Sequence, residues 1–183
     1  MPAKTIVELN DSKIIWFHKT KHKKLMFAVL NKNIKNLFNV SNNLFAQEVS
    51  ECISAKLSLV FDKEYSVYYV NSSFALNGYG PFIYDVAMHH CSSLGYGISP
   101  DRYWVSKEAM NLWKYYYTKR NNELIIDDLH EECQVSSYKN KELEFMNKQY
   151  KAKQPNISLY QPIVVNETSN FYDSLTKNML LLF

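Results

Sequence analysis

The sequence predicts an α/β (α+β) fold, in which one mixed sheet is flanked by helices. The chain has 183 residues, of which 46% are hydrophobic and 21% are charged, as expected for a folded domain rather than a disordered chain. Strand-like segments that pair locally come both before and after helical patterns. No apolar run approaches the roughly 18 residues that span a bilayer. We therefore expect a single domain over residues 1–183 that does not associate with a membrane.

Two β-hairpins are expected in the first 70 residues. Ile14–Phe17 and Leu25–Leu30 are short apolar segments joined by a basic turn, His18–Lys24. Leu57–Phe61 and Tyr65–Val70 are rich in strand-forming residues and flank a charged turn of three residues. Each pair predicts two antiparallel strands.

Helical patterns occupy three regions. Residues 34–60 mix apolar and polar positions in a mostly helical spacing. A helix is predicted over Phe82–Leu94, with Pro81 at its first position, where the backbone needs no N–H. Ser106 is a suitable N-cap for a further helix, Lys107–Lys119.

The last third of the chain gives weaker signals. Leu124–Ile126 predicts a short strand, and the polar, lysine-rich residues 134–156 predict either a surface helix or a mobile loop. Ile157–Val165 predicts a late strand. A spacing of three or four residues predicts a closing helix that includes Phe171, Leu175, Met179 and Leu182.

Charge and cysteine content narrow the function classes. A net charge of +3 does not by itself indicate a nucleic-acid-binding protein, although residues 1–35 hold eight lysines against two carboxylates. Cys52, Cys91 and Cys133 are odd in number and widely spaced, which predicts free thiols in a reducing compartment. The N-terminus lacks the pattern of a secretory signal. We therefore expect a cytoplasmic protein.

All four glycines lie within one stretch of twenty residues, Gly78–Gly97. A sequence this poor in glycine is expected to place it where a side chain is excluded. Two ordinary turns around a helix would account for the pattern. A more specific hypothesis is that Gly78 and Gly80 let a ligand approach the backbone at the start of the Phe82 helix, where free N–H groups and the helix dipole favour a diphosphate.

The stretch around these glycines resembles motif A of the GNAT superfamily of N-acetyltransferases, R/Q-x-x-G-x-G/A. Further stretches resemble a divergent group encoded by tailed bacteriophages, in which similar pieces recur in the same order over roughly residues 74–133. Those pieces in this sequence are Gly78–Asp85, Asp101-Arg102, Val105–Ala109 and Trp113–Tyr117.

The resemblance implies that acetyl-CoA is the co-substrate and that an amine of unknown identity accepts the acetyl group. A backbone N–H at Leu76 or Asn77 would polarise the thioester carbonyl. Tyr116 and Tyr117 are the expected proton donors to the departing thiolate, because Trp113 occupies the family's usual tyrosine position. Asp101, Glu108 and Asp127 are the candidate bases for removing a proton from the acceptor amine. The residues implied to bind the cofactor are Leu76, Asn77, Gly78, Tyr79, Gly80, Phe82 and Ile83.

Other functions stay open. Ala75, Pro81 and Trp113 favour a phage structural or host-interaction protein that keeps the fold without turnover, in the host cytoplasm or in the virion. A nucleic-acid-binding module that uses the basic N-terminal hairpin is less favoured, and assembly into a homo-oligomer is left undecided. No metal site is expected, because the adjacent His89 and His90 point about 100° apart on a helix.

Overall fold

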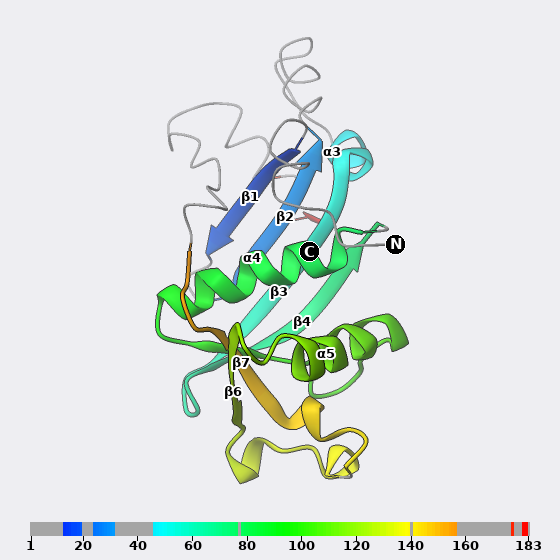
Figure 1. The fold of residues 1–183 in the computed structure, drawn as a ribbon. Helices are drawn as coiled ribbons and strands as arrows, with labels where there is room; N and C mark the ends of the chain where they lie inside the picture. The colour runs from blue at the N-terminus through cyan, green and yellow to red at the C-terminus, as the bar shows by residue number, and fades with distance from the viewer. Residues whose placement is uncertain are drawn as a thin grey trace.

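A mixed sheet with the strand order β1-β2-β3-β4-β5-β7-β6 organises the structure, a computed structural model (Figure 1). The structure describes residues 13–19, 24–31, 46–76, 78–139, 141–156, 177, 181 and 182. Within this part of the chain, none of the helices combines the length and the apolar character that a bilayer-crossing helix needs. The expected α+β class is confirmed.

The first four strands form an antiparallel meander. They are β1 (Lys13–Lys19), β2 (Leu25–Asn31), β3 (Ile53–Asp62) and β4 (Val67–Ala75). Both predicted hairpins are confirmed. All six residues Leu25–Leu30 are buried. Such continuous burial fits the sequence of β2, in which apolar and polar residues do not alternate.

The helical expectation for residues 34–60 is wrong from Ile53 onward. Only a short helix, α3 (Ala46–Cys52), is described in this region, and β3 follows it directly. Ala55, Leu57 and Leu59 recur with a period of two and are all fully buried, so the pleat of a strand explains their spacing. Residues 32–45 lie outside the described part.

A β–α–β unit follows the meander. Helix α4 (Gly80–Ser93) leads from β4 to β5 (Gly97–Ser99), which is parallel to β4, and Figure 1 shows α4 lying across the sheet. Ile83, Ala87 and Cys91 of α4 are buried against the same sheet face as Phe27 and Leu57. This packing fixes the start of α4 at the end of β4.

Backbone conformation or close packing favours glycine at three of the four glycine positions. Gly78 and Gly95 both have a φ of 86°, which a side chain disfavours. A Cβ at Gly97 would lie 2.8 Å from Gln149 Oε1 and 3.2 Å from Gln149 Cβ, so the side chains of β7 would have to shift to accommodate it. Gly80 is different, since the contact that its Cβ would make with the described residues is an ordinary one, to Ala75 Cβ at 3.9 Å.

The C-terminal part of the described chain completes the sheet. Helix α5 (Lys107–Lys119) has its expected bounds, and β6 (Leu124–Asp128) pairs with β7 (Lys148–Ala152). Residues 134–156, expected to form a surface helix or a mobile loop, instead supply two short 3-10 turns and all of β7, which lies between β5 and β6. Another 3-10 turn precedes these two turns. The three are η1 (Glu131–Cys133), η2 (Ser136–Tyr138) and η3 (Glu144–Asn147). The expected strand Ile157–Val165 and nearly all of the expected closing helix lie outside the described residues.

Candidate functional site

The sheet opens beside the second half of β4. Its antiparallel pairing with β3 extends over the whole strand, Val67–Ala75. The parallel pairing with β5 covers only Val67–Tyr69, because β5 ends at Ser99 and is followed by a proline. Within the described residues, no strand pairs with this edge of β4 beyond Tyr69.

The open edge presents main-chain hydrogen-bonding groups. The Leu76 N–H donates to the Ser54 carbonyl of β3, with an N···O distance of 2.9 Å. Since successive residues of an antiparallel strand direct these groups to opposite sides, Ala75 and Ser73 direct theirs away from β3. The bond to Ser54 also means that the Leu76 N–H is already used within the sheet. This N–H was one of the two groups expected to polarise a thioester carbonyl.

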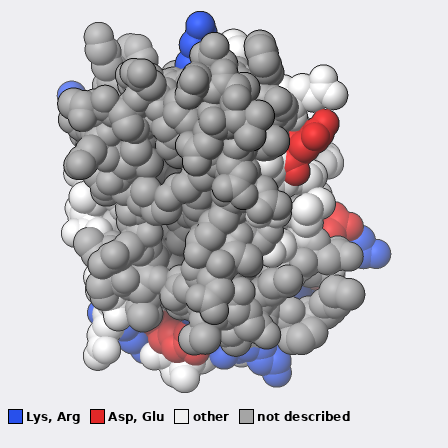
Figure 2. Space-filling model, turned by 90° about the horizontal axis from the view of Figure 1, so that it is seen from above, with Lys and Arg blue, Asp and Glu red and all other residues white. Residues whose placement is uncertain are grey.

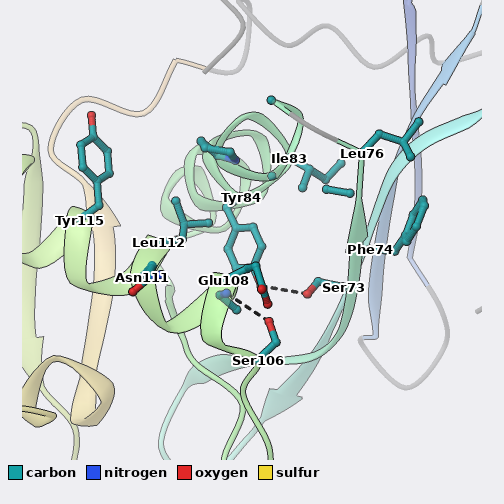
Figure 3. A pocket seen from close by; sticks show the side chains of 15 residues that line it. Ser73, Phe74, Leu76, Ile83, Tyr84, Ser106, Glu108, Asn111, Leu112 and Tyr115 are labelled. Carbon is teal, nitrogen blue, oxygen red and sulfur yellow. Dashed lines mark hydrogen bonds between the residues drawn. The ribbon is translucent and has the colours of Figure 1, made fainter. Parts of the chain in front are cut away.

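A cavity of about 840 Å³ lies at this opening (Figure 3). Its walls come from the end of β4, the first turns of α4 and the first half of α5. The lining residues are Ser73, Phe74, Ala75, Leu76, Gly78, Gly80, Pro81, Ile83, Tyr84, Ser106, Glu108, Ala109, Asn111, Leu112 and Tyr115.

The start of α4 lies at the cavity wall without a side-chain cap. Tyr79 is the N-cap residue and makes no side-chain hydrogen bond to the helix, whose first bond runs from Ile83 N–H to the Tyr79 carbonyl. Among the described residues, no hydrogen bond involves the Gly78 or Gly80 N–H. Both glycines line the cavity at a helix start, which is where main-chain N–H groups form anion sites in other proteins.

The residues expected to bind the cofactor divide into three groups. Leu76, Gly78, Gly80 and Ile83 line the cavity. Tyr79 and Phe82 instead contribute to the hydrophobic core, with exposed fractions of 8% and 5%. Asn77 lies outside the described residues.

Hydroxyl groups and one carboxylate are found at one end of the cavity. The Tyr84 hydroxyl donates to Ser73 Oγ at 3.2 Å, and Ser106 Oγ accepts the Ala109 N–H at 3.2 Å as the cap of α5. Glu108 lies in the first turn of the same helix. Figure 3 shows these residues at the end of the cavity opposite Leu76 and Ile83. Burial raises the pKa of Tyr84, so its hydroxyl stays neutral at physiological pH.

The expected proton donors, Tyr116 and Tyr117, do not line this cavity. The Tyr116 side chain is fully buried, and its hydroxyl lies 3.1 Å from the Pro81 carbonyl oxygen and 3.0 Å from Asp85 Oδ1. Burial raises the pKa of Tyr116 well above its ordinary value. The Tyr117 hydroxyl donates to Glu144 at 2.8 Å. The Tyr117 residue lines a separate cavity of about 540 Å³. These contacts make Tyr116 a link between α5 and the start of α4.

The structure also separates the three alternative bases. Glu108 lines the cavity. Asp101 is outside it, and its Oδ1 accepts the N–H groups of Tyr103 and Trp104 at 2.6 and 3.2 Å. Asp127 is exposed on β6.

An ion pair missed by the sequence analysis also holds α5 against α4. Arg120 Nη1 lies 2.6 Å from Asp85 Oδ1, and its guanidinium lies over the Tyr116 ring, 5.3 Å from the ring centre. The spacing of four residues between Tyr116 and Arg120 could have indicated the contact with the ring, whereas the ion pair with Asp85 depends on how α5 packs against α4.

The histidines and cysteines do not form a metal centre in the described part of the chain, where no group of three or more His, Cys, Asp or Glu residues could hold an ion. His89 Nδ1 accepts the Asn156 N–H at 3.0 Å. All three cysteines are free, as predicted, and burial raises the pKa of Cys91, which makes that thiol unreactive.

Both signs of charge occur on the face that Figure 2 shows. The lysine and arginine side chains visible there lie around its margin, with Asp and Glu side chains among them. The basic turn expected at His18–Lys24 lies largely outside the described residues.

Comparison with known proteins finds no matching family model, curated protein or solved structure. The site must therefore be interpreted from its own geometry.

Proposed function

We propose that the cavity beside β4 binds acetyl-CoA and that the protein transfers the acetyl group to an amine. The observation that carries this proposal is that, among the described residues, the end of β4 has no strand on this side, α4 begins close after it with no side-chain cap from Tyr79, and both line one cavity. The Gly78 and Gly80 N–H groups and the dipole of α4 suit a diphosphate. Among the described residues no lysine or arginine lines the cavity, so the main-chain donors are assigned that role.

The open edge of β4 suits the extended amide-containing arm of coenzyme A. Ser73 and Ala75 offer N–H and C=O groups to its amides, as a neighbouring strand would. Leu76, Ile83 and Leu112 add apolar contacts along the same wall. A ligand bound in this way extends from the glycines toward Ser73 and Tyr84.

The reacting thioester then lies at the hydroxyl end. With the Leu76 N–H used by β3, the Ser73 N–H is the main-chain donor placed to polarise the carbonyl. The amine nitrogen forms a bond to the carbonyl carbon, the C–S bond breaks, and the thiolate is released. Glu108 is the cavity carboxylate able to take the proton that the attacking amine loses.

Acetyl-CoA is expected to raise the melting temperature of the protein and of a Gly80→Ala variant, but not of Gly80→Asp. The alanine fits, because among the described residues a Cβ here meets Ala75 Cβ at an ordinary contact distance of 3.9 Å. The aspartate places a negative charge where the diphosphate would bind. Ligand at a hundredfold its dissociation constant stabilises a protein by about 2.7 kcal/mol. Equal stabilisation of Gly80→Asp and Gly80→Ala in a thermal-shift titration would disprove the assigned site.

Release of free thiol from acetyl-CoA, measured with and without added amines, tests the transfer itself. Amine-dependent release is expected from the unmodified protein and from Gly80→Ala. Stabilisation by acetyl-CoA without any thiol release would reduce the proposal to a coenzyme A-binding protein without turnover.

A further inference from the structure

The charge of the cavity is one-sided. Among the described residues that line it, Glu108 is the one that carries a charge at neutral pH, and this part of the lining includes no lysine, arginine or histidine. A cation that enters the cavity therefore meets a carboxylate, whereas an anion near Glu108 is repelled.

The hydroxyl groups near Glu108 have acceptor capacity left. The Tyr84 oxygen uses its proton toward Ser73 and keeps its lone pairs, and Ser106 Oγ accepts one bond from a main-chain N–H. A primary ammonium group has three donors and no acceptor. Its needs are complementary to an exposed carboxylate with hydroxyl oxygens at the same end of the cavity.

Aromatic side chains provide a second feature of the same cavity. Phe74 and Tyr115 line it and are 45% and 48% exposed, so their rings can contact a ligand. Ring faces pack against methylene groups and attract cations. They favour an alkyl chain that ends in an ammonium group over a small ion.

We propose that the hydroxyl end of the cavity, formed by Ser73, Tyr84, Ser106 and Glu108, binds a primary alkylammonium group. Its role as the acceptor site rests on the proposed function and makes the acetyl acceptor a cationic alkylamine, which loses one proton to Glu108 before it attacks and its second proton to the departing thiolate. Both a polyamine and a lysine side chain carry this group. Acceptors with a carboxylate or phosphate close to the amine are disfavoured by Glu108.

The test is a calorimetric titration in the absence of acetyl-CoA. Spermidine probes a polyamine, and Nα-acetyl-lysine methyl ester probes a lysine side chain. Nα-acetyl-norleucine methyl ester has nearly the same shape without the ammonium group. We expect at least one of the two cationic probes to bind and the norleucine ester not to bind, and the tighter cationic probe identifies the source of the amine.

The matched variants are Glu108→Gln, which keeps the shape of the side chain, and Glu51→Gln, which changes an exposed carboxylate on α3 outside the cavity. Glu108→Gln is expected to weaken binding by about tenfold or more, the loss that follows removal of a hydrogen bond to a charged group. Glu51→Gln should bind as the unmodified protein does. Equal affinity of Glu108→Gln and the unmodified protein, equal binding of the norleucine ester, or no binding of either amine would overturn the inference.

The two proposals fail separately, because this titration contains no acetyl-CoA. Amine binding that depends on Glu108, without stabilisation by acetyl-CoA, would support the ammonium site and refute the transferase. Stabilisation by acetyl-CoA without amine binding would support the coenzyme A site and refute the ammonium site.

Discussion

Replacing Trp113 with alanine is expected to lower the free energy of unfolding by about 4 kcal/mol. The side chain is 1% exposed, and its ring joins three elements. Its centre lies 5.4 Å from the Tyr84 ring of α4, 4.9 Å from the Tyr150 ring of β7 and 5.8 Å from the Tyr116 ring of its own helix. Urea unfolding measures the loss, and the melting temperature should fall by roughly 10 °C.

Trp104→Ala is the matched control for this variant. Trp104 is 75% exposed in the loop that precedes α5, so the same truncation leaves no buried cavity. A change within about 0.5 kcal/mol is expected. Equal losses for the two variants would contradict the packing of α5 against α4 and β7, and with it the position of one wall of the cavity.

The elements that could be predicted from sequence are those fixed by local signals. The bounds of α5 follow from Ser106, whose side chain accepts the Ala109 N–H at 3.2 Å, and from the apolar spacing that places Trp113 and Tyr116 in the core. The two hairpins follow from strand-forming segments joined by short polar turns. Each of these signals lies within one short, continuous segment of the chain.

Strand β7 could not be predicted because its pairing is distant in sequence. Only Tyr150 and Ala152 of its five residues are buried, and lysines occupy two positions. Its partners β5 and β6 come earlier in the chain, and only their spacing in the sheet leaves room for a strand between them. Local propensity carries no information on such a gap.

The candidate site could be predicted only in part, because only part of it depends on local sequence signals. The glycine cluster indicated the start of α4, which does line the cavity. The open edge of β4 depends on β5 being only three residues long. The burial of the Tyr116 hydroxyl depends on how α5 crosses α4. Tertiary packing decides both.

Replacing Arg120 with methionine is expected to cost about 3 kcal/mol at pH 7, toward the lower end for breaking a buried ion pair, because the Arg120 and Asp85 side chains keep 16% and 22% of their exposure. The variant leaves the Asp85 carboxylate without its cation beside α5. Burial raises the pKa of Asp85, and Arg120 and Tyr116 counteract this rise. Without Arg120 the pKa of Asp85 rises further.

The pH dependence of this variant separates the ion pair from simple loss of packing. A carboxyl group whose pKa is higher in the folded state than in the unfolded state stabilises the fold below the unfolded pKa, about 3.9, and that stability is lost as pH rises through the folded pKa. The difference in unfolding free energy between the unmodified protein and Arg120→Met should therefore be largest near pH 7 and shrink toward pH 4, as measured by urea unfolding across this range. Adding Asp85→Asn removes the titrating group, so the double variant should be more stable than Arg120→Met at pH 7 and lose most of this pH dependence. A penalty for Arg120→Met that is the same at pH 4 and pH 7 would mean that the arginine acts through its packing on Tyr116, and that α5 is held at the start of α4 without help from the Asp85 charge.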